Sequence, residues 1–141
     1  MTDALIQVGI ETIGTLHPDA ISLVGDGLYF DLGHRFRNPH HDPAMRYRTG
    51  LDPAVREHVL TTPGVMPMVE RIAESAKAVL AAYADPRRLL VNVTIACRGG
   101  RHRSVAVAEA VAAYLRTDGI AVEVRHHHIG EPVIENQPPA L

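Results

Sequence analysis

The chain has 141 residues, 46% of them hydrophobic and 21% charged, which fits one globular domain with a buried core. Its formal net charge of −2 gives no general argument for nucleic-acid binding, and its one cysteine excludes an internal disulfide and fits a reducing compartment. No stretch is apolar enough to span a bilayer and no signal peptide precedes the first predicted strand, so we expect a cytoplasmic protein without a membrane partner.

The first part of the chain predicts a strand, an ambiguous apolar segment and a long loop. Residues 5–13 alternate loosely between apolar and polar side chains, which is typical of a strand. Residues 21–32 are apolar but are interrupted by Gly25-Asp26-Gly27, so both a strand and a hairpin fit them. Residues 33–50 are polar and hold four arginines and three histidines. A loop of this length inside a compact domain is usually functional or disordered.

Two helices are predicted after this loop. The pair Asp52-Pro53 is typical of an N-cap followed by proline in the first turn, and predicts a short helix that ends near Leu60. Residues 65–83 place their apolar side chains on one continuous stripe, which predicts a long helix packed against the core. We expect an Asp-Pro pair at 85–86 to end this helix.

A glycine-containing turn then joins a predicted strand to a second long helix. Residues 89–96 are apolar and β-branched, which is typical of a buried strand. They are followed by the octet Cys97-Arg98-Gly99-Gly100-Arg101-His102-Arg103-Ser104. Apolar side chains recur at helical spacing from 105 to 115. The octet is therefore expected to be the turn of a β-α-β unit.

The ends of this second helix lead to a prediction for the whole fold. We expect Ser104 to be its N-cap and Gly119 to be the residue just after it. A last strand, from 120 through the three histidines that end at 128, follows. The sequence thus predicts a single α/β domain over residues 1–130, with a mixed or mostly parallel sheet of four or five strands flanked by helices. Residues 131–141 are predicted to be a flexible tail.

The chemistry of the octet favours an anion. Backbone N–H groups and the positive end of the helix dipole face out of such a turn, and Gly99 and Gly100 allow a ligand to approach the backbone closely. Arg103 can offer a bidentate fork, and His102 can act as a hydrogen-bond donor. The alternative is a tight turn whose arginine and histidine side chains face water.

The octet resembles the Cys-Thr-Gly-Gly-x-His-Arg-Ser motif in the C-terminal domain of the RapZ family. Further stretches agree with that family in the same order, over roughly residues 6–129. They are Thr12-Ile13-Gly14-Thr15-Leu16-His17, similar to Ser-Phe-Gly-aromatic-Lys-His, then Phe30-Asp31, Asn38-Pro39-His40 and Thr49-Gly50-Leu51-Asp52.

The members of that family are RNase adapters, often labelled nucleotide-binding. The resemblance implies a small α/β sandwich with a phosphate-sized pocket, which in the family binds an amino-sugar phosphate and regulatory RNA and which forms oligomers. The family's kinase-like domain has no counterpart here, since the chain contains no Walker A motif, and we expect no cofactor. Leu16 stands where the family has lysine, and the chain ends in an acidic, proline-containing tail. Both departures weaken the expectation of RNA binding more than that of an anion pocket.

The resemblance implies a function and a set of site residues. The expected function is a binding module for a phosphosugar, phosphate or nucleotide, acting as a sensor or adapter without catalysis. By position, the pocket would be formed by Gly99, Gly100, His102, Arg103, Ser104, Arg35 or Arg37, Asn38, His40 and His17. Phosphate would be bound by backbone N–H groups and arginine, and sugar hydroxyls by neutral polar side chains.

The first alternative is catalytic. The spacing from Cys97 to Arg103 is that of cysteine phosphatases, in which a thiolate attacks phosphorus and the arginine clamps the equatorial oxygens. Asp31 or Asp42 would serve as the general acid. Ala96 stands where those enzymes usually carry histidine. Burial of the cysteine at the end of a strand is the structural alternative.

Two further alternatives depend on histidines and arginines. His126 and His128 lie two residues apart on a predicted strand and could form half of a zinc site, although nothing in the sequence completes it, so no metal is predicted. RNA binding would require an arginine face. The candidates for that face are Arg35, Arg37, Arg46, Arg48, Arg98, Arg101, Arg103 and Arg125.

Overall fold

The protein folds around one parallel sheet, and the computed structural model describes residues 5–83 and 90–137. The strands are β1 (Val8–Gly14), β2 (Leu28–Asp31), β3 (Val91–Cys97) and β4 (Val122–His126). They pair in the order β2-β3-β1-β4, and every pair is parallel. The predicted single α/β domain is confirmed, and the sheet has four strands in the described part of the chain.

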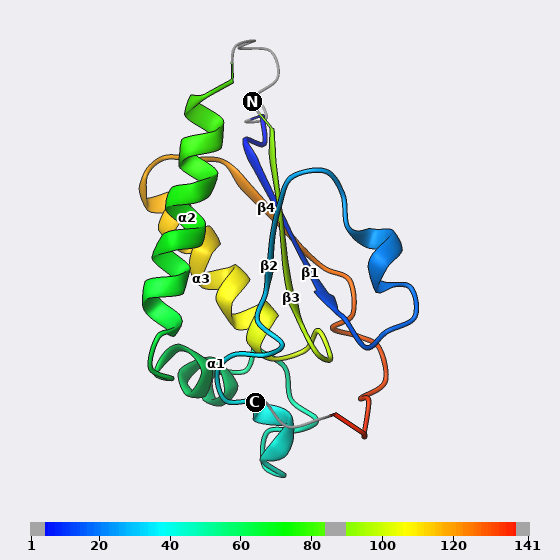
Figure 1. Cartoon of the computed structure of the whole chain (residues 1–141). Helices are drawn as coiled ribbons and strands as arrows, with labels where there is room; N and C mark the ends of the chain where they lie inside the picture. The colour runs from blue at the N-terminus through cyan, green and yellow to red at the C-terminus, as the bar shows by residue number, and fades with distance from the viewer. Residues whose placement is uncertain (1–4, 84–89, 138–141) are drawn as a thin grey trace.

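Three helices cover one face of this sheet (Figure 1): α1 (Pro53–Leu60), α2 (Val65–Ala81) and α3 (Arg103–Thr117). The predicted start of α1 is confirmed, because the Asp52 side chain accepts a hydrogen bond from the backbone N–H of Ala54 and proline follows it. The predicted helix stop at 85–86 lies outside the described residues.

The ends of α3 confirm one predicted cap and correct the other. Gly119 has a φ of +77° and its N–H donates to the carbonyl of Arg116, as expected for the residue after a helix. The N-cap is His102 and not Ser104, which lies inside the helix, and no side chain caps the N-terminus of α3. The amides of its first turn therefore have no helical partners.

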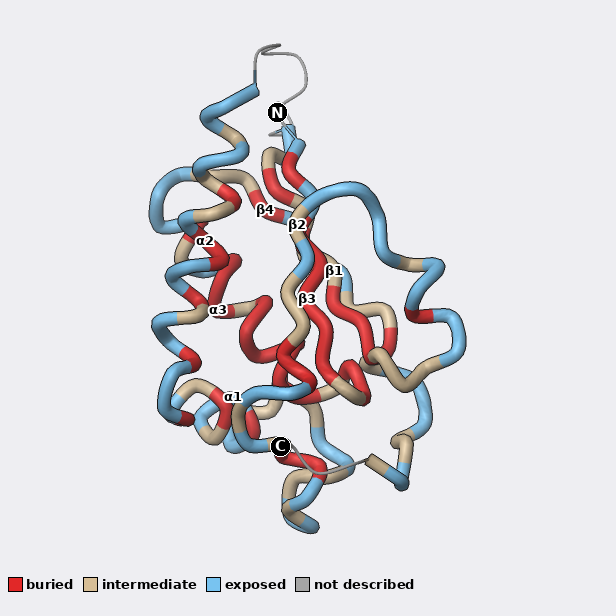
Figure 2. Tube along the Cα trace, in the orientation of Figure 1, coloured by how far each residue is buried: buried red, intermediate tan, exposed pale blue. Residues whose placement is uncertain are grey.

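The core lies between the sheet and the three helices, where buried positions from strands and helices meet (Figure 2). Alternate residues of the strands point to this side because side chains in a strand have a period of two. The first three turns of the apolar stripe predicted for residues 65–83 are buried here, whereas Val79 and Tyr83 at its C-terminal end are exposed. Buried side chains at the centre of the core include Ile10, Ile72, Val93, Ile95, Val111 and Leu115.

The segment between β1 and β2, which includes a short 3-10 turn, η1 (Ala20–Leu23), lies on the opposite face of the sheet (Figure 1). The sequence left residues 21–32 open between a strand and a hairpin. The structure forms η1 and the parallel strand β2 from them, with no hairpin. The chain runs from β1 to β2 in one direction across the sheet and from β2 through β3 to β4 in the other. Right-handed crossovers in opposite directions must use opposite faces.

This change of direction defines the end of the sheet at which ligands usually bind. After β1 the chain crosses the open face, and after the adjacent strand β3 it crosses the helical face. In α/β sheets such a switch point, at the carboxyl ends of the strands, is the common location of a binding site. The octet that begins at Cys97 lies there.

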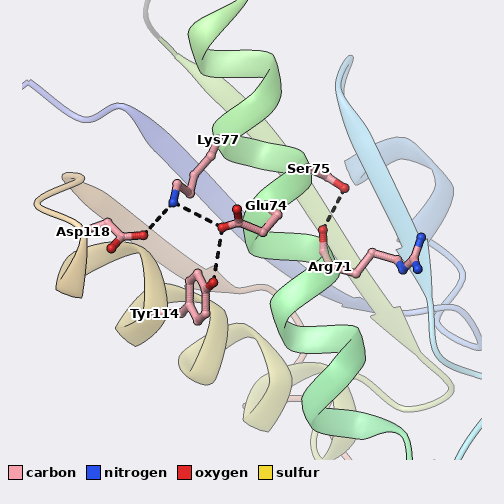
Figure 3. A network of polar contacts seen from close by, with 6 residues as sticks. All are labelled: Arg71, Glu74, Ser75, Lys77, Tyr114 and Asp118. Atoms are coloured by element: carbon pink, nitrogen blue, oxygen red, sulfur yellow. Dashed lines mark hydrogen bonds and ion pairs between the residues drawn. The ribbon is translucent and has the colours of Figure 1, made fainter.

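A polar network joins α2 to α3 on the outer surface (Figure 3). Lys77 Nζ lies 2.8 Å from the Asp118 carboxylate and 3.2 Å from Glu74, which also accepts a hydrogen bond from Tyr114. Hydrogen bonds to these two carboxylates, with that of Asp118 the larger, raise the pKa of Lys77. Exposed ion pairs add little stability, so packing of the apolar stripe holds the two helices together. In residues 5–83 and 90–137, no helix has the length and apolarity that a bilayer crossing requires.

Candidate functional site

The turn between β3 and α3 packs directly against the end of β1. A Cβ atom added to Gly14 would lie 2.6 Å from the backbone nitrogen of Gly100. Gly100 has a φ of +73°, and a Cβ atom there would lie 2.7 Å from the backbone nitrogen of Gly14. The two loops can approach this closely only because both positions are glycine.

The carbonyl and amide groups of this turn are used very differently. The carbonyls of Cys97 and Arg98 accept hydrogen bonds from the backbone of Thr15 and Leu16, and that of Gly99 accepts one from His17 Nε2 at 3.0 Å. Within residues 5–83 and 90–137, the amides of Gly99, Arg101 and His102 donate no hydrogen bond. The carbonyl oxygens of the turn are engaged by the loop after β1, whereas these amides have no acceptor among the described residues. The turn therefore offers positive partial charge beside the uncapped N-terminus of α3.

Cys97 lies beneath this turn with its thiol satisfied. Its Sγ accepts a hydrogen bond from the amide of Gly100 at 3.3 Å and lies 3.1 Å from Ser104 Oγ. Ser104 therefore contacts the thiol rather than capping α3. Cys97 is buried, with 2% of its surface exposed.

Arg103 is among the largest fully buried side chains, with 1% of its surface exposed. Its Nη1 donates to the carbonyls of Leu32 at 3.0 Å and Arg35 at 2.9 Å, while its buried Nε has no partner. No carboxylate in the described part of the chain forms an ion pair with it, and Asp31 acts only at longer range. Burial lowers the pKa of Arg103. The guanidinium thus ties the turn to the end of β2 and carries a charge that these neutral carbonyls do not cancel.

His102 and Arg101 face away from the turn toward the 33–50 loop. His102 Nε2 donates to the carbonyl of Met45 at 3.1 Å, and burial lowers the pKa of His102 to about 4. Arg101 donates from Nη2 to the carbonyl of Tyr47 at 2.6 Å. These two side chains hold the loop in place, and the His102 imidazole nitrogen Nε2 is already engaged by the loop.

His17 lies on the other side of the turn and stacks on His128, with ring centroids 4.2 Å apart. His128 accepts a hydrogen bond from the Gly14 amide at Nδ1, and its Nε2 lies 2.9 Å from the Asp19 carboxylate. The hydrogen bond with His128 is the main cause of a lowered pKa of Asp19. Sequence reasoning missed both Asp19 and His128 as neighbours of the site, since no local pattern links residues 109 positions apart.

The predicted residues of the 33–50 loop divide into two groups. Asn38 and His40 lie near the turn and contact the C-terminal segment: Asn38 Nδ2 donates to Gln137 Oε1 at 2.9 Å and His40 Nε2 to the Glu135 carbonyl at 3.0 Å. Arg35 is exposed, and its carbonyl receives Arg103. Arg37 turns away and donates to Thr62 Oγ1 and the carbonyl of His58.

The C-terminal segment was also missed, because a polar, proline-containing tail gives no sequence signal for docking. In the described part of the tail, the side chains of Glu135 and Gln137 approach the loop and the turn. Gln137 Nε2 lies 3.0 Å from where a Cβ atom of Gly99 would be. The predicted site therefore has a cover that belongs to the same chain.

The two histidines that were considered as half of a zinc site point to different partners. β4 ends at His126, so His126 and His128 do not share one face of a strand. His126 Nε2 lies 3.2 Å from Glu109 in α3, whereas His128 pairs with Asp19. No group of three potential metal ligands occurs in residues 5–83 and 90–137.

The eight arginines that were considered as a face for RNA are not all exposed. Arg103 is buried, so the eight arginines do not form one exposed surface. Arg98 donates from Nε to the carbonyl of Gly33 and helps Arg103 to hold the end of β2. Arg125 lies on β4, next to Glu123, on the open face of the sheet near Asn92.

Comparison with known proteins agrees with this architecture and these motifs. The family described as the RapZ C-terminal domain matches residues 8–130. A protein from Rhodospirillum rubrum named nucleotide-binding protein is 38% identical over 105 residues, which are 74% of this chain and 32% of the relative. Proteins with the same type of name occur in Zymomonas mobilis, at 37% identity over 78% of this chain and 34% of the relative, and in Leifsonia xyli, at 34% identity over 89% of this chain and 41% of the relative.

The chain thus spans about a third of the length of the relatives it matches first. The family match covers both strands that meet at the switch point, the turn between β3 and α3, and the histidines after β4. The chain belongs to the RapZ C-terminal domain family.

Proposed function

We propose that this chain is a binding module for a phosphorylated small molecule, a phosphosugar or a nucleotide, whose phosphate binds at the turn between β3 and α3. Relatives named nucleotide-binding protein support the general class of ligand. The observation that carries the proposal is Arg103, a guanidinium with 1% exposure, no ion pair among the described residues and a buried Nε without a partner. A buried cation of this kind is costly unless an anion lies close to it.

The main chain supports the same conclusion independently of Arg103. The unused amides of Gly99, Arg101 and His102 lie beside the uncapped first turn of α3. Such an arrangement can donate several hydrogen bonds to one phosphate, and the helix dipole adds a favourable interaction. Bound phosphate would restore the pKa of Arg103 toward its usual value by offsetting the effect of burial.

Neutral polar side chains next to the turn suit the rest of the ligand. Asn38 and His40 come from the 33–50 loop, and His17 comes from the loop after β1. Amide and imidazole groups pair well with hydroxyl groups and with base edges. We assign this module a sensor or adapter role, in which the protein responds to the concentration of the ligand and breaks no bond in it.

Gly99 allows a test that leaves the fold intact. Its φ is not positive, and an added Cβ atom would meet only the end of the flexible Gln137 side chain. Gly99→Asp places a carboxylate at the proposed phosphate, and Gly99→Asn places a neutral group of the same shape there. Inorganic phosphate, an amino-sugar phosphate and AMP should each be tested, by thermal unfolding, against both variants and the wild type.

We expect at least one of these compounds to raise the Tm of the wild type and of Gly99→Asn but not that of Gly99→Asp, because like charges repel. Equal stabilisation of Gly99→Asp and Gly99→Asn would place the ligand elsewhere. A wild-type Tm that none of the three compounds raises would reject the proposed function.

A further inference from the structure

Residues 131–137 lie beyond the part of the chain that the family matches, yet they contact the proposed site. This segment carries two carboxylates, at Glu131 and Glu135, and faces a loop that contains four arginines. Only Val133, Ile134 and Gln137 are even half-buried within it. It is thus held on the surface by a few polar contacts rather than by a core of its own.

Two side chains, Arg101 and Tyr47, anchor the segment. Arg101 Nη1 donates to the carbonyls of Ile129 and Glu131, both at 3.2 Å. The Tyr47 hydroxyl donates to Glu135 Oε1 at 3.1 Å. Arg101 belongs to the turn and Tyr47 to the 33–50 loop, so the segment crosses from one to the other.

At Glu135 and Gln137 the segment occupies the donors that a ligand would need. The Glu135 carbonyl takes the Nε2 proton of His40, whose side chain is almost fully buried. Gln137 Oε1 takes a proton of the Asn38 amide, and Gln137 Nε2 lies over Gly99 at the turn itself. A ligand that reaches Asn38, His40 and the Gly99 amide must therefore replace these contacts.

We propose that residues 131–137 are an intramolecular competitor that leaves the site when the phosphorylated ligand binds. This inference rests on the proposed function and concerns the regulation of the same site. Departure of the segment frees the Nε2 of His40, and a polar group of the ligand can accept this hydrogen bond in place of the Glu135 carbonyl. Only molecules in which the segment has left the site can bind the ligand. The apparent affinity is therefore the intrinsic affinity multiplied by the fraction of such open molecules.

Side-chain variants of the full chain can loosen the segment without altering residues of the proposed site. Gln137→Ala removes the bond to Asn38, and Tyr47→Phe removes the bond to Glu135. Asn136→Ala is the matched control, because Asn136 is exposed and its side chain makes no hydrogen bond in the described part of the chain. The affinity of each protein for an amino-sugar phosphate and for AMP is then measured by isothermal titration calorimetry.

We expect the double variant Tyr47→Phe with Gln137→Ala to bind about fivefold more tightly than the wild type, and Asn136→Ala to bind like the wild type. Unchanged affinity in the double variant would overturn the competitor role and leave the proposed function intact. Weaker binding would overturn it too, because it would make the segment part of the bound state. Absence of binding in all proteins, including the double variant, would reject both the site and its regulation.

A protease that cleaves after glutamate provides a second readout. Cleavage after Glu135 requires the segment to leave its hydrogen bonds with His40 and Tyr47. We expect a saturating ligand to accelerate this cleavage severalfold in the wild type and to have little effect in the double variant. Protection of Glu135 by the ligand in the wild type would contradict the proposal.

Discussion

The guanidinium of Arg103 is bonded to the main chain of Leu32, with Nη1 3.0 Å from the carbonyl oxygen. The first residue of α3, the helix that follows β3, is thus connected to the end of the neighbouring strand β2. The same nitrogen also reaches the carbonyl of Arg35. One side chain therefore combines a structural role with the positive charge on which the proposed function depends.

This double role predicts a loss of stability when Arg103 is truncated. Arg103→Ala should lower the free energy of unfolding by about 2–4 kcal/mol, since it leaves buried carbonyls without donors. Arg103→Lys, which keeps the charge and part of the bonding, should lose less. Urea denaturation measures both changes. If Arg103→Ala unfolds at the same urea concentration as the wild type, the clamp to β2 is not a structural element.

Substitutions at two glycines with positive φ angles distinguish the cost of backbone strain from the cost of steric overlap. Gly100 and Gly119 have φ angles of +73° and +77°, but only Gly100 has neighbours where a Cβ atom would lie. Gly119→Ala should cost about 1 kcal/mol of unfolding free energy, from the left-handed backbone alone.

Gly100→Ala should cost clearly more, because its Cβ atom would lie 2.7 Å from the backbone nitrogen of Gly14. Thermal unfolding of the two variants, side by side, gives the comparison. Equal losses of stability would show that the loops after β1 and β3 are not packed as tightly as described.

Burial of His102 predicts that mild acid destabilises the protein. The pKa of His102 in the folded state is about 4, below its usual 6.5, because burial disfavours the charged form. A histidine with a depressed folded pKa stabilises the fold fully above pH 6.5, and this stability is lost as the pH falls from 6.5 toward 4. The loss amounts to about 3 kcal/mol for this shift.

Unfolding free energies between pH 7.5 and 4, measured by urea titration, check this slope. In His102→Gln the amide can still donate to the Met45 carbonyl but cannot titrate, so the slope should become shallower. Burial lowers the pKa of His40 and His58 as well, and both act in the same direction. An unchanged slope in His102→Gln would assign the acid sensitivity to those residues.

The position of Cys97 predicts binding without phosphate hydrolysis. Its thiol is buried and satisfied by Gly100 and Ser104, and the Nη1 of Arg103 is occupied by main-chain carbonyls. We expect no hydrolysis of p-nitrophenyl phosphate by the wild type, and an unchanged affinity of Cys97→Ser for phosphorylated ligands. Turnover by the wild type that Cys97→Ser abolishes would instead support the cysteine phosphatase alternative.

The sequence was sufficient to predict the elements that show a clear apolar pattern, either a stripe at helical spacing or a continuous run typical of a buried strand. The stripe of α2 and the apolar run of β3 face a single core, so local patterns determine them. The cap of α3 was predicted wrongly because Ser104 has a long-range partner, the Cys97 thiol, that competes with capping. Neither the burial of Arg103 nor the contacts of Gln137 could be predicted, because both depend on carbonyls and amides brought together from β2, the 33–50 loop and the tail.

The most direct test of phosphate binding at the turn is a backbone amide NMR titration of the wild type with an amino-sugar phosphate, repeated with AMP and with inorganic phosphate. At least one of the three should cause saturable downfield shifts of the amide protons of Gly99, Arg101 and His102, since these donors are unused in the described structure. Shifts confined to other parts of the chain, or none with any of the three compounds, would contradict the account.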